Sequence, residues 1–226
     1  MKLEQLKEEI LAHAGCGFEP CETATRMVPG EGSPEAEVMF VGEAPGANED
    51  KQGLPFVGSA GKLLEKLLGE IGLARADVFI ANVLKCRPPG NRDPHPTEIE
   101  ACQDYLWRQI DLIQPLVLCT LGNFSTKLLR GDPTGITRLH GSAEVRVIGP
   151  RAVRLYPIYH PAAALYTPSM LDTLRADFAR IPGLLAQPAP DQPEPVPEVE
   201  PEVVQAAAAE PEVEESVREA DQLGLF

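Results

Sequence analysis

Val38-Met39-Phe40-Val41 runs directly into Gly42-Glu43-Ala44-Pro45-Gly46, and this junction of an apolar run with a glycine-containing loop indicates the kind of fold. A short apolar run bounded by turn formers is typical of a buried parallel strand. In an open α/β sheet, ligands bind in the crevice beyond the carboxyl ends of the strands. The junction therefore predicts that Glu43 lies at a ligand-binding edge. The alternative is an ordinary strand-to-helix turn with a solvated glutamate.

Strand-like and helix-like segments alternate along the chain on both sides of this junction. Such alternation is the signature of a parallel sheet with helices on both faces. We therefore expect an α/β fold with three layers, α/β/α, around a central, mainly parallel four-stranded sheet. The expected strands are 36–42, 78–81, 116–121, 145–148 and 154–159, and the expected helices are 2–14, 60–71, one from 97, one after 123 and one from 160 to about 181.

Three polar side chains follow expected strands at the points where these end. Glu43 follows the first strand, Asn82 the second and His160 the last. Because parallel strands end at one edge of a sheet, a carboxylate, an amide and an imidazole are expected to meet there. Each residue also has a simpler interpretation, since Asn82 suits a turn and His160 suits a helix cap.

The charge of the chain is concentrated near its C-terminus. Of the net charge of −14 over 226 residues, −10 comes from the Pro- and Glu-rich residues after 186, so residues 1–186 carry only −4. A nearly neutral domain can still present a basic face to nucleic acid. The 43% hydrophobic composition of the whole chain suits a core, and we expect one domain over 1–186 and a disordered acidic linker over 187–221.

No run of eighteen apolar residues is present, and the N-terminus lacks the layout of a signal peptide. We therefore expect a cytoplasmic protein, and a monomer. In a reducing compartment the five cysteines are better explained as metal ligands or core residues than as disulfides.

Five ordered motifs of the chain resemble family 4 uracil-DNA glycosylases, which carry an iron–sulfur cluster. The resemblance extends from about residue 2 to about residue 183. The motifs are Val41–Gly46, Asp50-Lys51, Gly53–Gly58, Asn82–Pro89 and Tyr159-His160-Pro161. The resemblance implies an enzyme that flips uracil out of DNA and excises it, leaving an abasic site.

The resemblance also implies roles for the residues of these motifs. Phe56 would stack on the flipped base, and Asn82 would read the uracil edge, where cytosine would leave buried groups unpaired. His160 would donate a hydrogen bond to uracil O2, and Glu43 would hold or activate water or stabilise the cationic sugar. The backbone at Gly42, Ala44 and Gly46 would share in stabilising the departing base, and Glu49 would crowd the methyl group of thymine.

Contacts with DNA are expected beside this pocket. The loop after His160 would press into the duplex, with Pro161 at its start and Leu165 as the wedge that fills the gap left by the base. A helix core position is the alternative for Leu165. The candidates for phosphate contacts are Ser59, Lys62, Lys85 and Arg87.

Four cysteines form two pairs, Cys16 with Cys21 and Cys86 with Cys102. Four thiolates hold either a [4Fe–4S] cluster or a structural zinc ion, and the resemblance favours the cluster. The first pair has four intervening residues, whereas family members more often have two. Cys119, inside an expected strand, is interpreted as a buried core thiol.

The last five residues, Gln222–Phe226, resemble the motif by which bacterial repair proteins dock on the sliding clamp. A tethered apolar anchor would raise the effective concentration of the enzyme at DNA, whereas a terminus without function is the alternative.

Two other functions remain open for the whole chain: a relative that binds uracil-DNA with little turnover, and a non-catalytic cluster-bearing adaptor.

Overall fold

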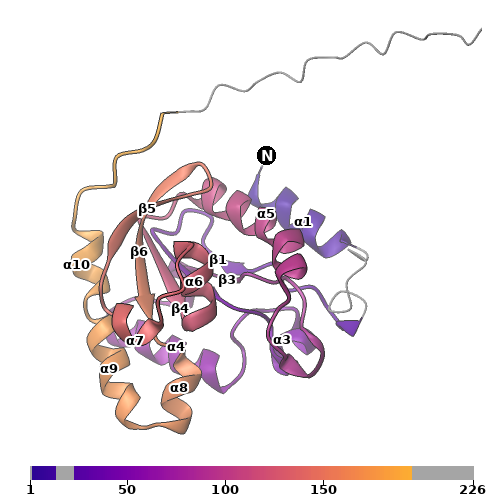
Figure 1. The fold of residues 1–226 in the computed structure, drawn as a ribbon, viewed down its shortest axis with the longest axis horizontal. Coiled ribbons are helices and arrows are strands. Elements are labelled where there is room, and N and C mark those ends of the chain that lie inside the picture. The colour runs from indigo at the N-terminus through magenta and orange to yellow at the C-terminus, as the bar shows by residue number, and fades with distance from the viewer. Residues whose placement is uncertain (1, 14–22, 195–226) are drawn as a thin grey trace, which may run out of the picture. The chain divides into compact units, whose positions relative to one another are not determined.

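The structure is a computed structural model that describes residues 2–13 and 23–194 (Figure 1). These residues belong to one compact unit, Met1–Glu194. The unit extends beyond the expected boundary at 186. Past that point, the side-chain amide of Gln192 accepts a hydrogen bond from Ala152 N at 3.1 Å and donates one to Ala152 O at 2.9 Å.

Within the described residues, one sheet contains six strands in the order β1-β3-β2-β4-β6-β5. The four central strands, β3, β2, β4 and β6, are mutually parallel, as expected. The expected number of four is nevertheless too small, because β1 and β5 add antiparallel edges. The strands are β1 (Glu31–Gly32), β2 (Val38–Gly42), β3 (Phe79–Asn82), β4 (Val117–Leu121), β5 (Glu144–Ile148) and β6 (Arg151–Ile158).

Helices cover both faces of the sheet and complete the expected three layers (Figure 1). Helices α4, α8, α9 and α10 pack against one face, while α1, α5 and α6 pack against the other. The helices are α1 (Leu3–Ala12), α3 (Ala47–Gln52), α4 (Ser59–Glu70), α5 (Pro96–Ile113), α6 (Asn123–Arg130), α7 (Ile136–Leu139), α8 (Pro161–Tyr166), α9 (Ser169–Phe178) and α10 (Ile181–Leu185), with short 3-10 turns η1 (Arg75–Asp77) and η2 (Pro89–Asn91).

The single helix expected from 160 to about 181 is divided in two. Pro168 disfavours helical backbone at the residue before it, and Thr167 accordingly adopts an extended conformation with φ −133°. The break separates α8, which directly follows His160, from α9, whose Phe178 ring stacks on Phe40 of the sheet at a centroid distance of 5.7 Å. The segment beside the candidate site is therefore a short, separate helix.

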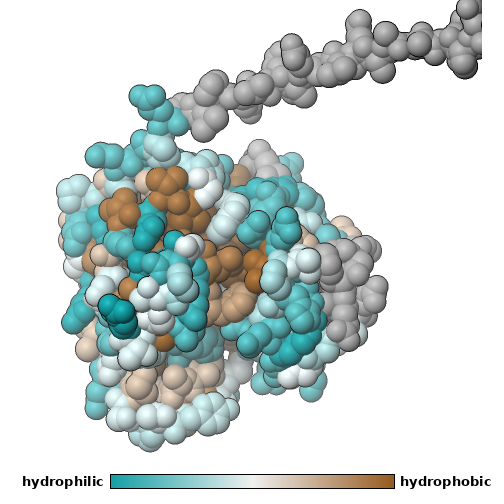
Figure 2. All heavy atoms as spheres, viewed as in Figure 1, coloured by the Kyte–Doolittle hydropathy of each residue, from teal (hydrophilic) through white to brown (hydrophobic). Residues whose placement is uncertain are grey.

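The surface combines charged residues with small apolar areas, one of them over β5 (Figure 2). Val145 and Val147 of this edge strand are exposed. None of the helices within 2–13 and 23–194 has both the length and the apolar character needed to cross a membrane.

Candidate active site

The parallel register brings the ends of β2 and β3 together. Gly42 pairs with Asn82, the last residues of their strands. The chain beyond the strands stays joined, because Val83 N donates to Gly42 O and Leu84 N donates to Glu43 O, each at 3.0 Å. Glu43 and Asn82 are therefore held at one edge of the sheet by backbone hydrogen bonds.

A cavity of about 460 Å³ opens at this edge. Seven of the residues expected to be catalytic or to contact the base line it: Glu43, Ala44, Gly46, Glu49, Phe56, Asn82 and His160. The three strand ends thus share one hollow, as the sequence predicts.

Gly42 lies directly behind the groups that line the cavity. A Cβ atom at this position would lie 2.4 Å from Asn82 Oδ1 and 2.8 Å from Phe56 Cζ. Both separations are far below van der Waals contact. The absent side chain therefore allows the Asn82 amide and the Phe56 ring to lie where they do.

The Phe56 ring forms one wall of the cavity, stacked with the His160 ring at a centroid distance of 5.5 Å and an interplanar angle of 27°. Its backbone has a left-handed φ of 51°, which is uncommon for a bulky residue. Gly61 of α4 packs beneath it, and a Cβ there would lie 1.7 Å from Phe56 O. The wall is thus set by tight backbone packing.

Glu49, in the first turn of α3, is bonded to the loop that carries Phe56. Its Oε1 accepts hydrogen bonds from Val57 N and Gly58 N, both at 3.0 Å. Its Oε2 lies where a Cβ on Gly46 would come within 2.8 Å. The carboxylate therefore fixes loop geometry as well as lining the cavity.

His160 enters the cavity as a neutral imidazole. Its Nδ1 accepts a hydrogen bond from Ala162 N at 3.1 Å, so Nε2 carries the proton and is a donor. Burial lowers the pKa of His160 to about 4, against the opposing effect of the Glu49 charge. A buried neutral N–H donor suits a partner that gains negative charge.

Glu43 is half-buried at the same edge. Burial raises the pKa of its carboxyl group, and the negative charge of Asp93 raises it further. A carboxylate in such surroundings is a stronger base than one in free solution. The arrangement can polarise a water molecule or oppose a developing positive charge.

The expected DNA contacts divide into accessible and buried residues. Ser59 lines the cavity, Lys62 and Leu165 are exposed, and Arg87 is partly exposed with its Nε bonded to Asn91 Oδ1 at 2.7 Å. These residues remain available to DNA.

The expected phosphate contact by Lys85 is wrong, because this side chain is 0% exposed. Its Nζ donates to Asn82 O at 2.8 Å and to Gln109 Oε1 at 2.7 Å, so it supports the end of β3 from within. Pro161, also expected to contact DNA, is buried in the first turn of α8, where proline is favoured.

Sequence reasoning missed part of the cavity wall. Pro88, Asn91 and Arg92 line it, although the sequence of this Pro-rich loop indicates no more than a connection. Glu98 of α5 holds Arg92 through hydrogen bonds of 3.0 and 2.6 Å. The one sequence signal that these residues line the cavity is that their loop directly follows the motif that carries Asn82.

Two of the four candidate metal-ligating cysteines are described. Cys86, on the loop after β3, and Cys102, on α5, are both buried, whereas Cys16 and Cys21 lie outside the described residues. Within the described ranges, no three His, Cys, Asp or Glu side chains gather as metal ligands. Cys119 is fully buried in β4, as expected, and burial raises the pKa of its thiol.

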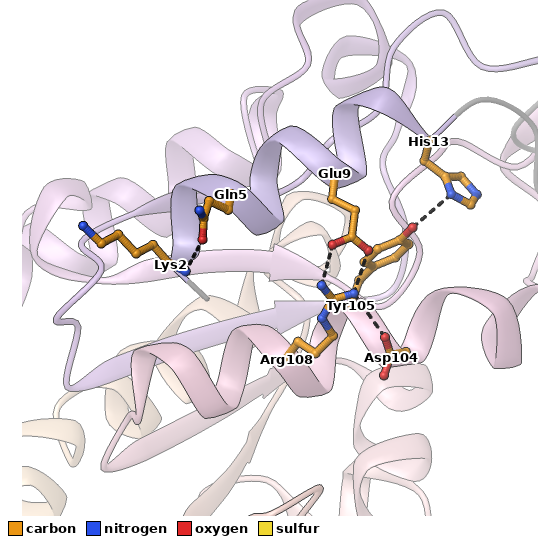
Figure 3. A network of polar contacts seen from close by, with 7 residues as sticks. All are labelled: Lys2, Gln5, Glu9, His13, Asp104, Tyr105 and Arg108. Carbon is orange, nitrogen blue, oxygen red and sulfur yellow. Dashed lines mark hydrogen bonds and ion pairs between the residues drawn. The ribbon is translucent and has the colours of Figure 1, made fainter. Parts of the chain in front are cut away.

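The path of α1 is compatible with a four-cysteine site. His13, at the end of α1, meets Tyr105 of α5 through a contact of 3.0 Å between Nδ1 and the hydroxyl, and Glu9 pairs with Arg108 (Figure 3). Tyr105 lies three residues after Cys102. The end of α1 therefore contacts the helix that carries Cys102. The thiolate donor set fits an iron–sulfur cluster or zinc.

Comparison with known proteins identifies the family. The model of the uracil DNA glycosylase superfamily matches residues 29–181, which include every lining residue of the cavity. The chain belongs to this superfamily. The type-4 uracil-DNA glycosylase of Sulfurisphaera tokodaii is 50% identical over 82% of this chain and 86% of its own length. That of Archaeoglobus fulgidus is 46% identical over 83% of this chain and 96% of its own length.

A second type in the superfamily matches less of the chain. The type-5 uracil-DNA glycosylase of Thermus thermophilus is 37% identical over 38% of this chain and 45% of its own length. The higher identity and coverage of the type-4 relatives confirm the expected membership in family 4.

Proposed function

We propose that this protein is a DNA repair glycosylase that hydrolyses the N-glycosidic bond of uracil in DNA and leaves an abasic site. One observation carries the proposal. An amide, an aromatic ring and a neutral imidazole donor, from Asn82, Phe56 and His160, face one cavity of about 460 Å³ in a member of the uracil-DNA glycosylase superfamily. The base reaches this cavity by leaving the helical stack, at a cost of a few kcal/mol.

Asn82 and Phe56 recognise the flipped base. The Asn82 side chain offers one acceptor and two donors, which match N3–H and O4 of uracil. Cytosine reverses this pattern and would leave buried groups unpaired, which is the strong form of discrimination. The Phe56 ring supplies stacking worth roughly 1–3 kcal/mol. Glu49, on α3 and bonded to the Phe56 loop, restricts the space for a methyl group on the base.

His160 and Glu43 assist bond cleavage. As the glycosidic bond breaks, negative charge develops on the base, and His160 Nε2–H donates to uracil O2. The backbone of the Gly42–Gly46 loop contributes further stabilisation. Glu43, kept at a raised pKa, orients the attacking water and opposes the positive charge of the sugar.

Incubation with a uracil-containing oligonucleotide and subsequent alkaline cleavage test the activity. The expected result is multiple-turnover cleavage at uracil, lost in Glu43→Gln. A burst without turnover would identify a uracil-DNA binder instead. Absence of any released uracil would favour the non-catalytic adaptor, and an unchanged rate in Glu43→Gln on single-stranded DNA would refute the role of Glu43.

Cys16, Cys21, Cys86 and Cys102 together hold a [4Fe–4S] cluster in this proposal. The burial of Cys86 and Cys102 and the approach of α1 to α5 support it. The bound cluster supplies a structural cross-link between these segments, since hydrolysis of the bond needs no electrons. The loop between Cys86 and Cys102 contains Pro88, Asn91 and Arg92, so the same cross-link supports the cavity wall.

Leu165 fills the gap that the flipped base leaves in the duplex. It is exposed on α8, the helix that directly follows His160. Ser59, Lys62 and Arg87 contact phosphates around the cavity mouth. Leu165→Ala is expected to slow excision from duplex DNA while sparing single-stranded DNA, because only the duplex needs a wedge. Equal losses on both substrates would exclude the wedge.

Gln222–Phe226 tethers the enzyme, as a monomer, to the bacterial sliding clamp. This segment lies outside the described residues, so its apolar composition after a long acidic stretch is the support. Deletion of 222–226 is expected to abolish co-elution with the purified clamp and to leave uracil excision on naked DNA unchanged. Retained clamp binding would refute the assignment.

A further inference from the structure

Arg75 forms hydrogen bonds with the backbone of the loop that carries Phe56, from outside the cavity. It lies on η1, between α4 and β3, and its side chain is 21% exposed. Its Nη1 donates to Phe56 O at 3.2 Å, and its Nη2 donates to Pro55 O. One guanidinium group therefore bonds two successive carbonyl groups. One of them belongs to Phe56, the residue whose ring stacks against His160.

The carboxylate of Glu49 binds the same loop through the backbone N–H groups that follow Phe56. Glu49 accepts from the N–H groups of Val57 and Gly58, directly after the two carbonyls that Arg75 binds. Between these two sets of bonds Phe56 keeps its left-handed φ of 51°. A bulky residue persists in this conformation only where its surroundings enforce it.

Arg75 is itself fixed by the edge strand β1. Its Nε donates to Glu31 Oε2 at 2.9 Å, and its Nη2 lies 2.7 Å from the same oxygen. Strand β1 is only two residues long and pairs with β3. Glu31 thus orients the guanidinium plane toward the Pro55 and Phe56 carbonyls, which a planar fork can bond in fixed geometry.

We propose that Arg75 is a positioning residue for base recognition, which holds the Phe56 backbone so that the ring faces the cavity beside His160. The proposal rests on the proposed function of the cavity. Arg75 does not line the cavity and needs no contact with DNA. Its effect on excision passes through Phe56.

Single-turnover excision of uracil by Arg75→Met tests this role. We expect the rate to fall by about tenfold, because small displacements of a positioning group are costly. Arg175→Met is the matched control, since it removes an arginine that pairs with Glu70 at 3.0 Å on the surface, away from the cavity. Its rate should equal that of the wild type. A rate for Arg75→Met within about twofold of the wild type would overturn the proposal.

A double-mutant cycle with Phe56→Ala separates positioning from a general loss of stability. If Arg75 acts through Phe56, the double variant should be no slower than Phe56→Ala alone. Losses that multiply would show independent action and would also overturn the proposal.

If Arg75→Met fails to fold, Arg75→Lys is a second variant that tests the same positioning role. An ammonium group cannot bond both carbonyls and Glu31 in the same fork geometry, so an intermediate rate is expected. A wild-type rate for Arg75→Lys, with Arg75→Met unfolded, would reject the proposal. Inactivity of the wild-type chain on uracil-DNA would instead reject the proposed function, so the two failures are distinguishable.

Discussion

Asn82 Oδ1 occupies the space that a side chain on Gly42 would need, with only 2.4 Å to the position of a Cβ atom. The other close neighbour is the tip of the Phe56 ring, at 2.8 Å. Both neighbours are ends of side chains and not backbone. An added methyl group would therefore displace the Asn82 amide and the Phe56 ring, the two groups proposed to recognise the base, while leaving the sheet in place.

Gly42→Ala is expected to fold normally and to lose uracil excision by about tenfold to a hundredfold, measured in single turnover. Gly69→Ala is the control, because a Cβ there meets nothing within 4 Å. It should keep full activity and raise stability by about 0.5–1 kcal/mol, as alanine replaces glycine within α4. Full activity in Gly42→Ala would mean that Asn82 and Phe56 do not read the base.

The acid limb of the pH–rate profile is expected to follow Glu43. The proposed role of Glu43 requires its carboxylate form, so the rate should fall as pH drops through its raised pKa. Asp93→Asn removes a negative charge that raises this pKa, so the limb should move to lower pH. Asp111→Asn changes a carboxylate that is exposed on α5 and does not act on Glu43, and should leave the limb in place. An unmoved limb in Asp93→Asn would contradict the assignment.

The cysteine assignment predicts a coloured protein. Purified wild-type protein should absorb broadly near the blue end of the visible spectrum, and Cys86→Ser and Cys102→Ser should each lose this absorbance. Cys119→Ser is the matched control, because Cys119 is equally buried but lies inside β4. A colourless wild-type protein with stoichiometric zinc would replace the cluster by a zinc site.

Truncation locates the end of the folded unit. A chain ending at Glu194 should melt like the full chain, because the hydrogen bonds of Gln192 to Ala152 are kept. A chain ending at Ala186 loses them, together with the bond from Arg154 to Pro188 O at 3.0 Å. We expect a loss of about 1–3 kcal/mol in the free energy of unfolding. Identical melting of the two truncated chains would place the end of the unit at 186.

The sequence is sufficient to predict the convergence at the sheet edge. Apolar runs ending at Gly42 and Asn82 indicate parallel strands, and parallel strands bring the residues at their carboxyl ends to one edge. The same argument predicts that His160 lies at this edge, because it follows the carboxyl end of β6. Phe56 does not, since it lies in a loop with a left-handed backbone, and only the resemblance to family 4 points to it.

The features that could not be predicted depend on long-range packing. The two residues of β1 are too few for any periodic pattern, and their pairing with β3 is visible only in three dimensions. Lys85 resembles a solvated basic residue in the sequence, because composition cannot reveal that Asn82 O and Gln109 Oε1 receive its ammonium group. Arg92 similarly lines the cavity through its bonds to Glu98.

The hydrogen bond from Ala162 N to His160 Nδ1 has a consequence for repeated turnover. It commits the imidazole to one tautomer before substrate arrives, and the low pKa keeps that form throughout the neutral range. In the proposed mechanism, His160 donates a hydrogen bond to the base without transferring its proton, so the imidazole needs no reprotonation after the base departs. Under that mechanism, His160 is already in its active form for the next lesion when the products leave.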